Sequence, residues 1–88
     1  MQTMKESPAT IWTDGTRPMR MFWRDRRWRV SDTPTGLFGE PEFLHPLMTH
    51  SPHVRIGWRF QATDESGESV VVDAVQRGSQ WVIVRTYS

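Results

Sequence analysis

One stretch of twelve residues, 19–30, constrains the fold of this chain more than any other. It reads M-R-M-F-W-R-D-R-R-W-R-V, and its apolar and basic side chains alternate with the two-residue period of a β-strand. The alternation breaks once, at R-D-R-R, and then resumes. We therefore predict a β-hairpin with strands at residues 18–24 and 27–31, one face rich in tryptophan and the other rich in arginine.

The turn of this hairpin determines which side chains face each other. A two-residue loop at residues 25–26 is expected, but neither residue is glycine, and such loops require positive φ angles. A longer loop, with shifted pairs, therefore stays open. With the short loop, the buried pairs are Trp23 with Trp28 and Met21 with Val30. The outer pairs are Phe22 with Arg29 and Arg24 with Arg27.

Further strands are predicted at residues 10–13, 54–62, 69–76 and 80–87, separated by turns rich in Gly, Asp and Ser. The last of them is apolar on both faces, as a central or closing strand should be. We expect an all-β fold, a small antiparallel SH3-like barrel or roll of five or six strands. Residues 1–9 are expected to be a flexible N-terminus and residues 10–88 a single domain. In the strand at 54–62, the predicted inward side chains are Val54, Ile56, Trp58, Phe60 and Ala62, and the outward ones are Arg55, Gly57, Arg59 and Gln61.

The composition suits a small domain with an aromatic core. Five Trp, four Phe and one Tyr in 88 residues provide large rings to bury. The absence of cysteine excludes disulfides and thiolate metal sites. The longest apolar run, at residues 81–84, is far too short to span a membrane, and residues 1–9 lack the apolar segment of a signal peptide. We expect a soluble cytoplasmic protein that does not bind membranes.

Residues 32–53 contain four prolines and two glycines and show no strand or helix period. We expect a long loop here, with a short helical turn at residues 42–49 that covers an open end of the sheet. Three histidines in this loop, His45, His50 and His53, are spaced so that they could ligate zinc. No supporting residues are apparent around them, and we interpret them as solvated. No metal or cofactor is expected.

Charge is concentrated in the hairpin although the net charge is only +1. Residues 17–30 contain six arginines and one aspartate, whereas the rest of the chain has five basic and nine acidic residues. Clustered arginines beside an exposed ring are typical of single-strand binders, in which cations follow the phosphates and the ring stacks on a base. We expect DNA or RNA as the partner, with single strands favoured. The candidate site residues are Arg20, Phe22, Arg24, Arg27 and Arg29 on the hairpin, with Arg55 and Arg59 extending the face from the next strand.

Two other interpretations remain open. The arginine face could be a solvated surface whose guanidinium groups pair with Asp64, Glu68 or Asp73. The domain could also bind a protein through the 32–53 loop or through an exposed strand edge. Among the tryptophans, Trp23, Trp28 and Trp58 are expected in the core, whereas Trp12 and Trp81 are better placed for partial exposure and a ligand role. In the alternative in which the 32–53 loop binds a protein, the apolar residues that would contact the partner are Phe38, Phe43, Leu44 and Met48.

No motif indicates catalysis. The chain lacks a Ser/His/Asp or Cys/His signature, a glycine-rich phosphate loop and a paired-carboxylate motif. We predict that the protein is not an enzyme, and no small-molecule substrate is identified.

The segment D-G-T-R-P-M-R-M-F-W-R-D-R-R-W-R-V resembles the opening of a small actinobacterial domain of unknown function, whose pattern is D-G-x-P-x-R-F-x-W-R-G-R-x-Y-R-V. The end of the chain, residues 79–87, is similar to that domain's last strand. The resemblance does not cover residues 32–53, and Asp25 stands where the pattern has Gly. Some members of that family are appended to proteins related to lesion-bypass DNA polymerases. The resemblance implies an accessory role in DNA handling, with a DNA-handling protein as a further partner.

Overall fold

The computed structural model describes residues 6–39 and 54–87, which form β-strands joined by turns. None of these residues belongs to a helix that could cross a membrane. The strands are β1 (Ser7–Asp14), β2 (Arg17–Trp23), β3 (Arg26–Val30), β4 (Thr35–Gly39), β5 (Val54–Asp64), β6 (Ser69–Arg77) and β7 (Gln80–Tyr87).

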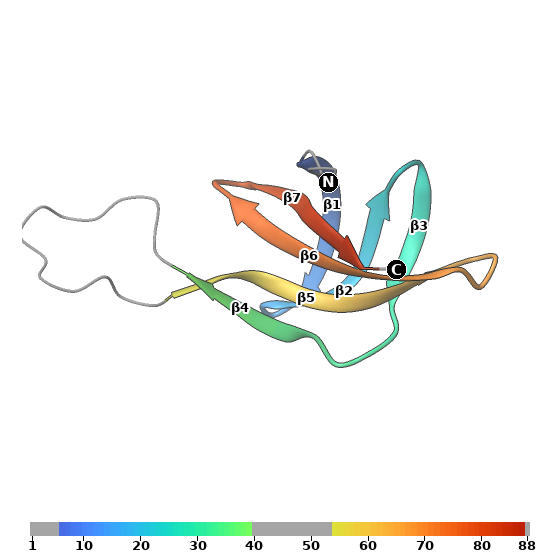
Figure 1. The fold of residues 1–88 in the computed structure, drawn as a ribbon, viewed down its shortest axis with the longest axis horizontal. Helices are drawn as coiled ribbons and strands as arrows, with labels where there is room; N and C mark the ends of the chain where they lie inside the picture. The colour runs from blue at the N-terminus through green and yellow to red at the C-terminus, as the bar shows by residue number, and fades with distance from the viewer. Residues whose placement is uncertain (1–5, 40–53, 88) are drawn as a thin grey trace, which may run out of the picture.

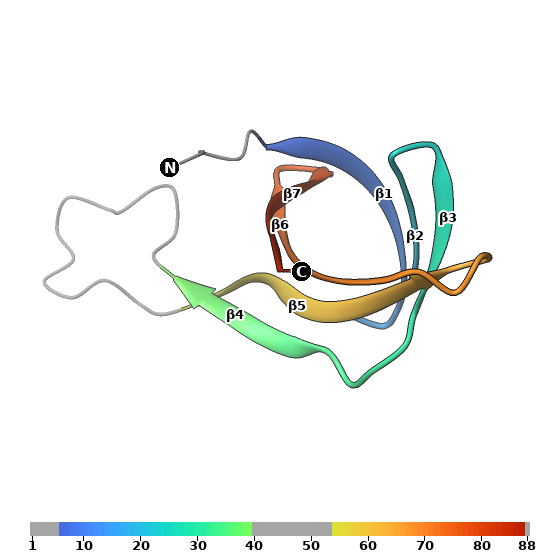
Figure 2. The same ribbon diagram turned by 45° about the vertical axis from the view of Figure 1, so that its right-hand side comes forward.

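Six of the strands close into an antiparallel barrel (Figures 1 and 2). Their order is β3-β2-β1-β7-β6-β5, and β3 closes the ring by pairing with the C-terminal part of β5. The N-terminal part of β5 extends beyond that contact and pairs with β4. The predicted small antiparallel barrel is confirmed. β4 is an additional strand, in a segment that we had expected to be a loop.

The core consists of the side chains that point into this barrel. Trp23 and Trp28 are buried in it, 1% and 4% exposed, with ring centroids 5.9 Å apart. Both indole N–H groups are satisfied: Trp28 donates to the carbonyl oxygen of Trp23 (2.9 Å) and Trp23 to the hydroxyl of Ser7 (3.1 Å). The predicted core positions of Trp23, Trp28 and Trp58 are confirmed. The other buried members of the cluster are Met21, Phe60, Ala62, Val72, Ala74 and Ile83.

The turn between β2 and β3 lies one residue earlier than predicted. Arg24 and Asp25 form it, with φ angles of 54° and 58°, the left-handed conformation that a two-residue hairpin turn requires. The predicted cross-strand pairs are therefore wrong by two residues. Because side chains alternate with a period of two, this shift leaves the residues that stay in the strands on their predicted faces, whereas Arg24, predicted opposite Arg27, lies in the turn. The observed pairs are Arg20 with Arg29, Met21 with Trp28, Phe22 with Arg27 and Trp23 with Arg26.

Two boundaries also differ from the prediction. Ser7, Pro8 and Ala9, expected in the flexible N-terminus, pair with β7. Their polar sequence conceals a strand whose inward side includes Ala9, which packs against the core. β4 escaped prediction because its glycines and the prolines around it obscure the strand period.

Strand β5 follows the predicted alternation only in its C-terminal half. Trp58, Phe60 and Ala62 are buried as expected, whereas Val54 is 39% exposed. A register shift in the β4–β5 pairing leaves Ile56 without a partner on β4 and interrupts the alternation there. The helical turn proposed at residues 42–49 lies outside the described residues.

Candidate nucleic-acid interface

The outer surface of strands β1, β2 and β3 carries two rings and three arginines in adjacent rows. Strand pairing places Trp12 beside Arg20 and Arg20 beside Arg29. The next row is Thr10 beside Phe22 and Phe22 beside Arg27. We call this surface the hairpin face and define it by Trp12, Arg20, Phe22, Arg27 and Arg29.

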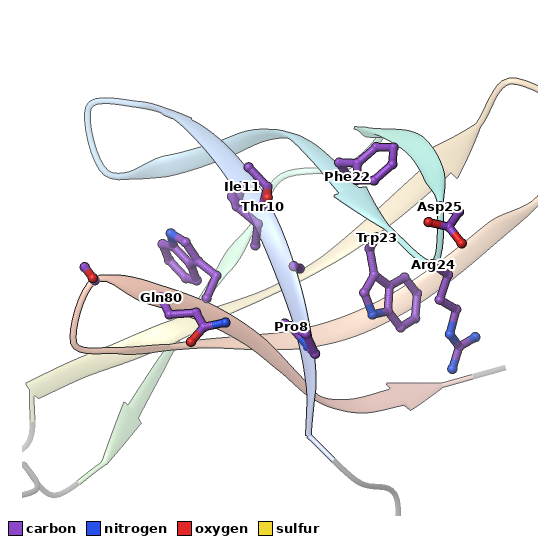
Figure 3. Close-up of a pocket in the computed structure, with 11 residues that line it drawn as sticks. Pro8, Thr10, Ile11, Phe22, Trp23, Arg24, Asp25 and Gln80 are labelled. Carbon is purple, nitrogen blue, oxygen red and sulfur yellow. The ribbon is translucent and has the colours of Figure 1, made fainter.

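Both rings of the hairpin face are open to solvent. Trp12 is 54% exposed and Phe22 is 41% exposed, whereas the next residue in the chain, Trp23, is almost completely buried. Phe22 and Trp23 leave β2 in opposite directions (Figure 3). A register shift after Trp12 leaves Met19 unpaired on β2 and 52% exposed. The irregularity therefore adds a thioether side chain next to the two rings.

The arginines of the hairpin face have no acidic partner within the described part of the chain. The ion pairs found there involve Arg26, Arg59 and Arg77, and none includes Arg20, Arg27 or Arg29. Arg20 and Arg29 also stand directly opposite each other. Like charges at such positions destabilise a sheet. The face therefore carries concentrated positive charge at some cost in stability.

The carboxylates that could have neutralised the hairpin face are held elsewhere. Asp64 accepts a hydrogen bond from Arg26 (3.0 Å), and Glu68 binds the same guanidinium group (2.9 Å). Asp73 receives two hydrogen bonds from Arg59 (2.7 and 3.1 Å) and one from the Tyr87 hydroxyl (2.8 Å). The carboxylates at positions 64, 68 and 73 thus pair with arginines outside the hairpin face.

These contacts change the pKa values of two aspartates. The side-chain hydrogen bond from Ser66 lowers the pKa of Asp64 most, and backbone N–H groups of Glu68 and Ser66 lower it further. Burial alone would raise the pKa of Asp73. The hydrogen bonds from Arg59 and Tyr87 outweigh burial and lower it. At neutral pH both carboxylates are therefore ionised in their ion pairs with Arg26 and Arg59.

The other three predicted site residues do not belong to the hairpin face. Arg24 lies in the turn, with its guanidinium carbon 4.1 Å from the centre of the Trp23 ring. Arg59 is four residues along β5 from Thr63, the partner of Arg29, which is roughly 13 Å along the strand. It is also bound to Asp73. Arg55 is farther still and covers the Trp58 ring at 4.6 Å.

Trp12 is the residue that the sequence-based site omitted. It belongs to a short segment whose alternation is weak, so its face could not be assigned without the pairing to Arg20. Its exposure agrees with the expectation that Trp12 is partly open to solvent. Trp81, the other candidate, is half-buried and packs against the core.

Hollows on three sides of Phe22 show how a ligand could approach the hairpin face. One of about 580 Å³ lies over Trp12, Met19, Arg20 and Arg27. A second, of about 570 Å³, lies beside the turn and is lined by Trp23, Arg24 and Gln80, among others (Figure 3). The third borders Arg27 but is lined by acidic residues, which would repel a polyanion. These are Asp25, Asp64, Glu65 and Glu68.

Comparisons with known proteins add no relative. No family model matches the chain, and no curated protein or solved structure matches it. The described residues also contain no group of three His, Asp or Glu side chains that could hold a metal ion. His45, His50 and His53 lie outside the described residues.

Proposed function

We propose that this protein is a binding domain for single-stranded nucleic acid, and that the hairpin face is its binding surface. Arg20, Arg27 and Arg29 contact phosphates, and Phe22 stacks on a base. The observation that carries the proposal is the combination, on one exposed surface, of exposed rings and of arginines that have no acidic partner among the described residues. Each feature alone is common on small β-domains, but together they match the two requirements of single-strand binding.

Single strands fit this surface better than a duplex does. The bases of a duplex are paired and stacked on each other, so they cannot offer a free face to Phe22. Cations alone would bind single strands and duplexes through phosphate contacts. The rings therefore provide the preference for single strands. The same argument makes binding tolerant of sequence, because every base has a face that can stack.

The salt dependence of binding tests the cationic part of the proposal. Three phosphate contacts on a single strand predict that log affinity falls with log salt at a slope of about −2. The measurement is the fluorescence anisotropy of a labelled ten-nucleotide oligo(dT) across a salt series. Replacing both Arg27 and Arg29 by Gln should reduce the slope to about −1, because one phosphate contact remains.

Arg55→Gln is the matched control for this experiment. It removes one arginine charge from the same protein, but at a site far along β5 from the hairpin. Its slope should equal that of the unmodified protein. An Arg55→Gln slope as shallow as that of the double variant would contradict the proposal, and so would the absence of binding at low salt.

A second candidate function is the binding of an extended peptide to strand β4. No described strand pairs with the outer edge of β4, and its sequence, T-G-L-F-G, has none of the charges that usually protect such an edge. Phe38 on this strand is 63% exposed. A peptide held by backbone hydrogen bonds would bind with little salt dependence and would lose affinity in a Phe38→Ala variant.

We also propose a cellular setting for the first function. The likeness of the hairpin sequence to the actinobacterial domain supports an accessory role in DNA handling. Capture of single-stranded DNA next to a polymerase-related partner would be the simplest form of that role. A preference for oligo(dT) over oligo(rU) of equal length in the anisotropy measurement would support DNA as the partner, and the reverse preference would contradict it.

A further inference from the structure

The hairpin face presents its two rings at a spacing that constrains how a strand can bind. Trp12 is the neighbour of Arg20, and Phe22 lies two residues farther along β2. The two rings are therefore diagonal neighbours on one face, at about 7–8 Å between their positions on the sheet. Successive bases in a stacked strand are separated by about 3.4 Å. Two neighbouring bases that stack on these rings cannot remain stacked on each other.

The arginines lie to one side of the rings. Across the sheet, the order is Trp12, Arg20, Arg29 in one row and Thr10, Phe22, Arg27 in the other. The ring-bearing side is thus toward β1 and the cationic side is toward β3. A strand that lies along β2 can place its bases over β1 and β2 and its phosphates over β3.

The charges around the hairpin face limit how far the phosphates can extend beyond β3. Beyond Arg27 lies the acidic hollow formed with the β5–β6 turn, in which Arg26 is already bound to Asp64 and Glu68. Phosphates would be repelled if the strand continued into that hollow. On the other side, Met19 and Trp12 line an open hollow of about 580 Å³ with no acidic residue. This hollow, lined by both rings and by Met19, leaves room for the bases beside Arg20 and Arg27.

From this geometry we infer that the hairpin face holds two adjacent, unstacked nucleotides of one strand, with one base on Trp12 and the next on Phe22. The inference rests on the proposed function and adds a second base-binding residue and a footprint. It also gives a base preference. Neighbouring adenines in a strand stack strongly on each other, and this stacking must be broken on binding. Oligo(dT) should therefore bind more tightly than oligo(dA).

A series of oligonucleotides that differ only in base content tests the footprint. The frame is a six-nucleotide strand of abasic sites that carries none, one, two or three adjacent thymines at its centre. For the unmodified protein, each of the first two thymines should raise the affinity about 5- to 150-fold, which corresponds to one stacking contact. The third thymine should add nothing. Equal gains for all three thymines, or a gain for the first alone, would overturn the inference.

Variants assign each gain to a ring. In Trp12→Ala and in Phe22→Ala, one thymine should raise the affinity and the second should not. Trp12→Thr keeps a β-forming residue in case the alanine variant folds poorly, and Trp12→Tyr should restore the second gain. Phe38→Ala, which removes another exposed ring far from the hairpin, is the control and should keep both gains. A Trp12→Ala or Trp12→Thr protein that keeps both gains would overturn the inference.

The outcomes separate this inference from the proposed function. If the abasic frame and oligo(dT) both fail to bind at low salt, both are wrong. If oligo(dT) binds with the expected salt slope but the Trp12→Ala protein keeps both affinity gains, the proposed function stands and the two-base footprint is wrong. The absorbance of oligo(dA) at 260 nm offers an independent check, because separation of its bases on binding should raise it, and an unchanged absorbance in the bound state would overturn the inference.

Discussion

Arg20 and Arg29 show at the residue scale why the hairpin face is better explained by binding than by stability. The two residues occupy directly opposite positions on β2 and β3, and no described carboxylate pairs with either. Residues that act in binding often reduce the stability of the free protein. The Arg20–Arg29 pair should therefore lower the stability of the free protein and raise its affinity for nucleic acid.

Replacing Arg29 by Thr tests that conflict. The change removes a like-charge contact and places a β-branched residue in the strand, so the free protein should gain about 0.5 kcal/mol. For a domain of this size, the midpoint of thermal unfolding should rise by about 2–4 °C at low salt. The affinity for oligo(dT) should fall in the same variant. A lower melting temperature together with unchanged affinity would show that Arg29 is a structural residue.

Gly57 is the residue at which the close approach of two strands leaves no room for a side chain. A β-carbon there would overlap the carbonyl oxygen of Ala74 and lie 2.8 Å from the α-carbon of Val75. Both are backbone atoms of β6, so relief requires a displaced strand. We expect Gly57→Ala to destabilise the protein by about 3 kcal/mol.

Urea unfolding of Gly57→Ala, with Gly36→Ala as control, measures this effect. At Gly36 the nearest atom to an added β-carbon is in the Phe38 ring, 3.1 Å away, and this exposed side chain can move. The control should lose much less stability. Similar losses in the two variants would contradict the strand packing described for β5 and β6.

At the scale of single elements, the first hairpin shows what alternation can and cannot determine. The two-residue period assigned Met21, Trp23 and Trp28 to the core and Phe22 to the surface, and the structure agrees. The position of the loop could not be deduced, because it depends on which residues tolerate positive φ, and R-D-R-R contains no glycine. Arg24 stacks on the Trp23 ring, which is a tertiary contact that the local sequence does not reveal.

Strand β4 and residue Trp12 illustrate the same limit. The T-G-L-F-G strand forms because β5 is long enough to offer it an edge beyond β3, a fact of topology rather than of local sequence. Trp12 joins the candidate site because β1 pairs with β2 in a particular register. The charged half of the site was evident from the sequence, whereas the second ring required the sheet.

The strained turn of the hairpin makes a prediction of its own. Asp25 has a φ of 58°, a conformation that strains a non-glycine residue by about 1 kcal/mol. Glycine adopts it without strain but loses about 0.5 kcal/mol more chain entropy on folding. Asp25→Gly should therefore gain about 0.5 kcal/mol and raise the thermal midpoint by about 2–4 °C. Arg24 is left unchanged, so its contact with Trp23 is preserved. A midpoint equal to or below that of the unmodified protein would contradict the turn geometry.

At the scale of the whole molecule, two buried aspartates link strands of the barrel to one another. Asp73 links β6 to Arg59 on β5 and Tyr87 on β7, and Asp64 links the β5–β6 turn to Arg26 on β3. Both have pKa values below the ordinary range. A carboxylate whose pKa is lower in the folded than in the unfolded state stabilises the fold above its unfolded pKa, and this contribution is lost as the pH falls through the folded pKa.

The barrel should therefore be stable near neutral pH and lose stability below about pH 4, the ordinary pKa of aspartate. Thermal unfolding across pH 2–7 measures this dependence. Asp73→Asn should lower the midpoint at pH 7, and the difference from the unmodified protein should narrow as the pH falls. A difference that stays constant over the whole range would show that the charge of Asp73 contributes nothing.

The central claim is that single-stranded nucleic acid binds the hairpin face, and an NMR titration of the ¹⁵N-labelled protein with oligo(dT) at low salt tests it most directly. We predict that the largest shift changes occur at the Trp12 indole N–H and at the amides of Arg20, Phe22, Arg27 and Arg29. Phe38 and Arg55 should change little. An unchanged spectrum, or changes confined to β4, would contradict the claim.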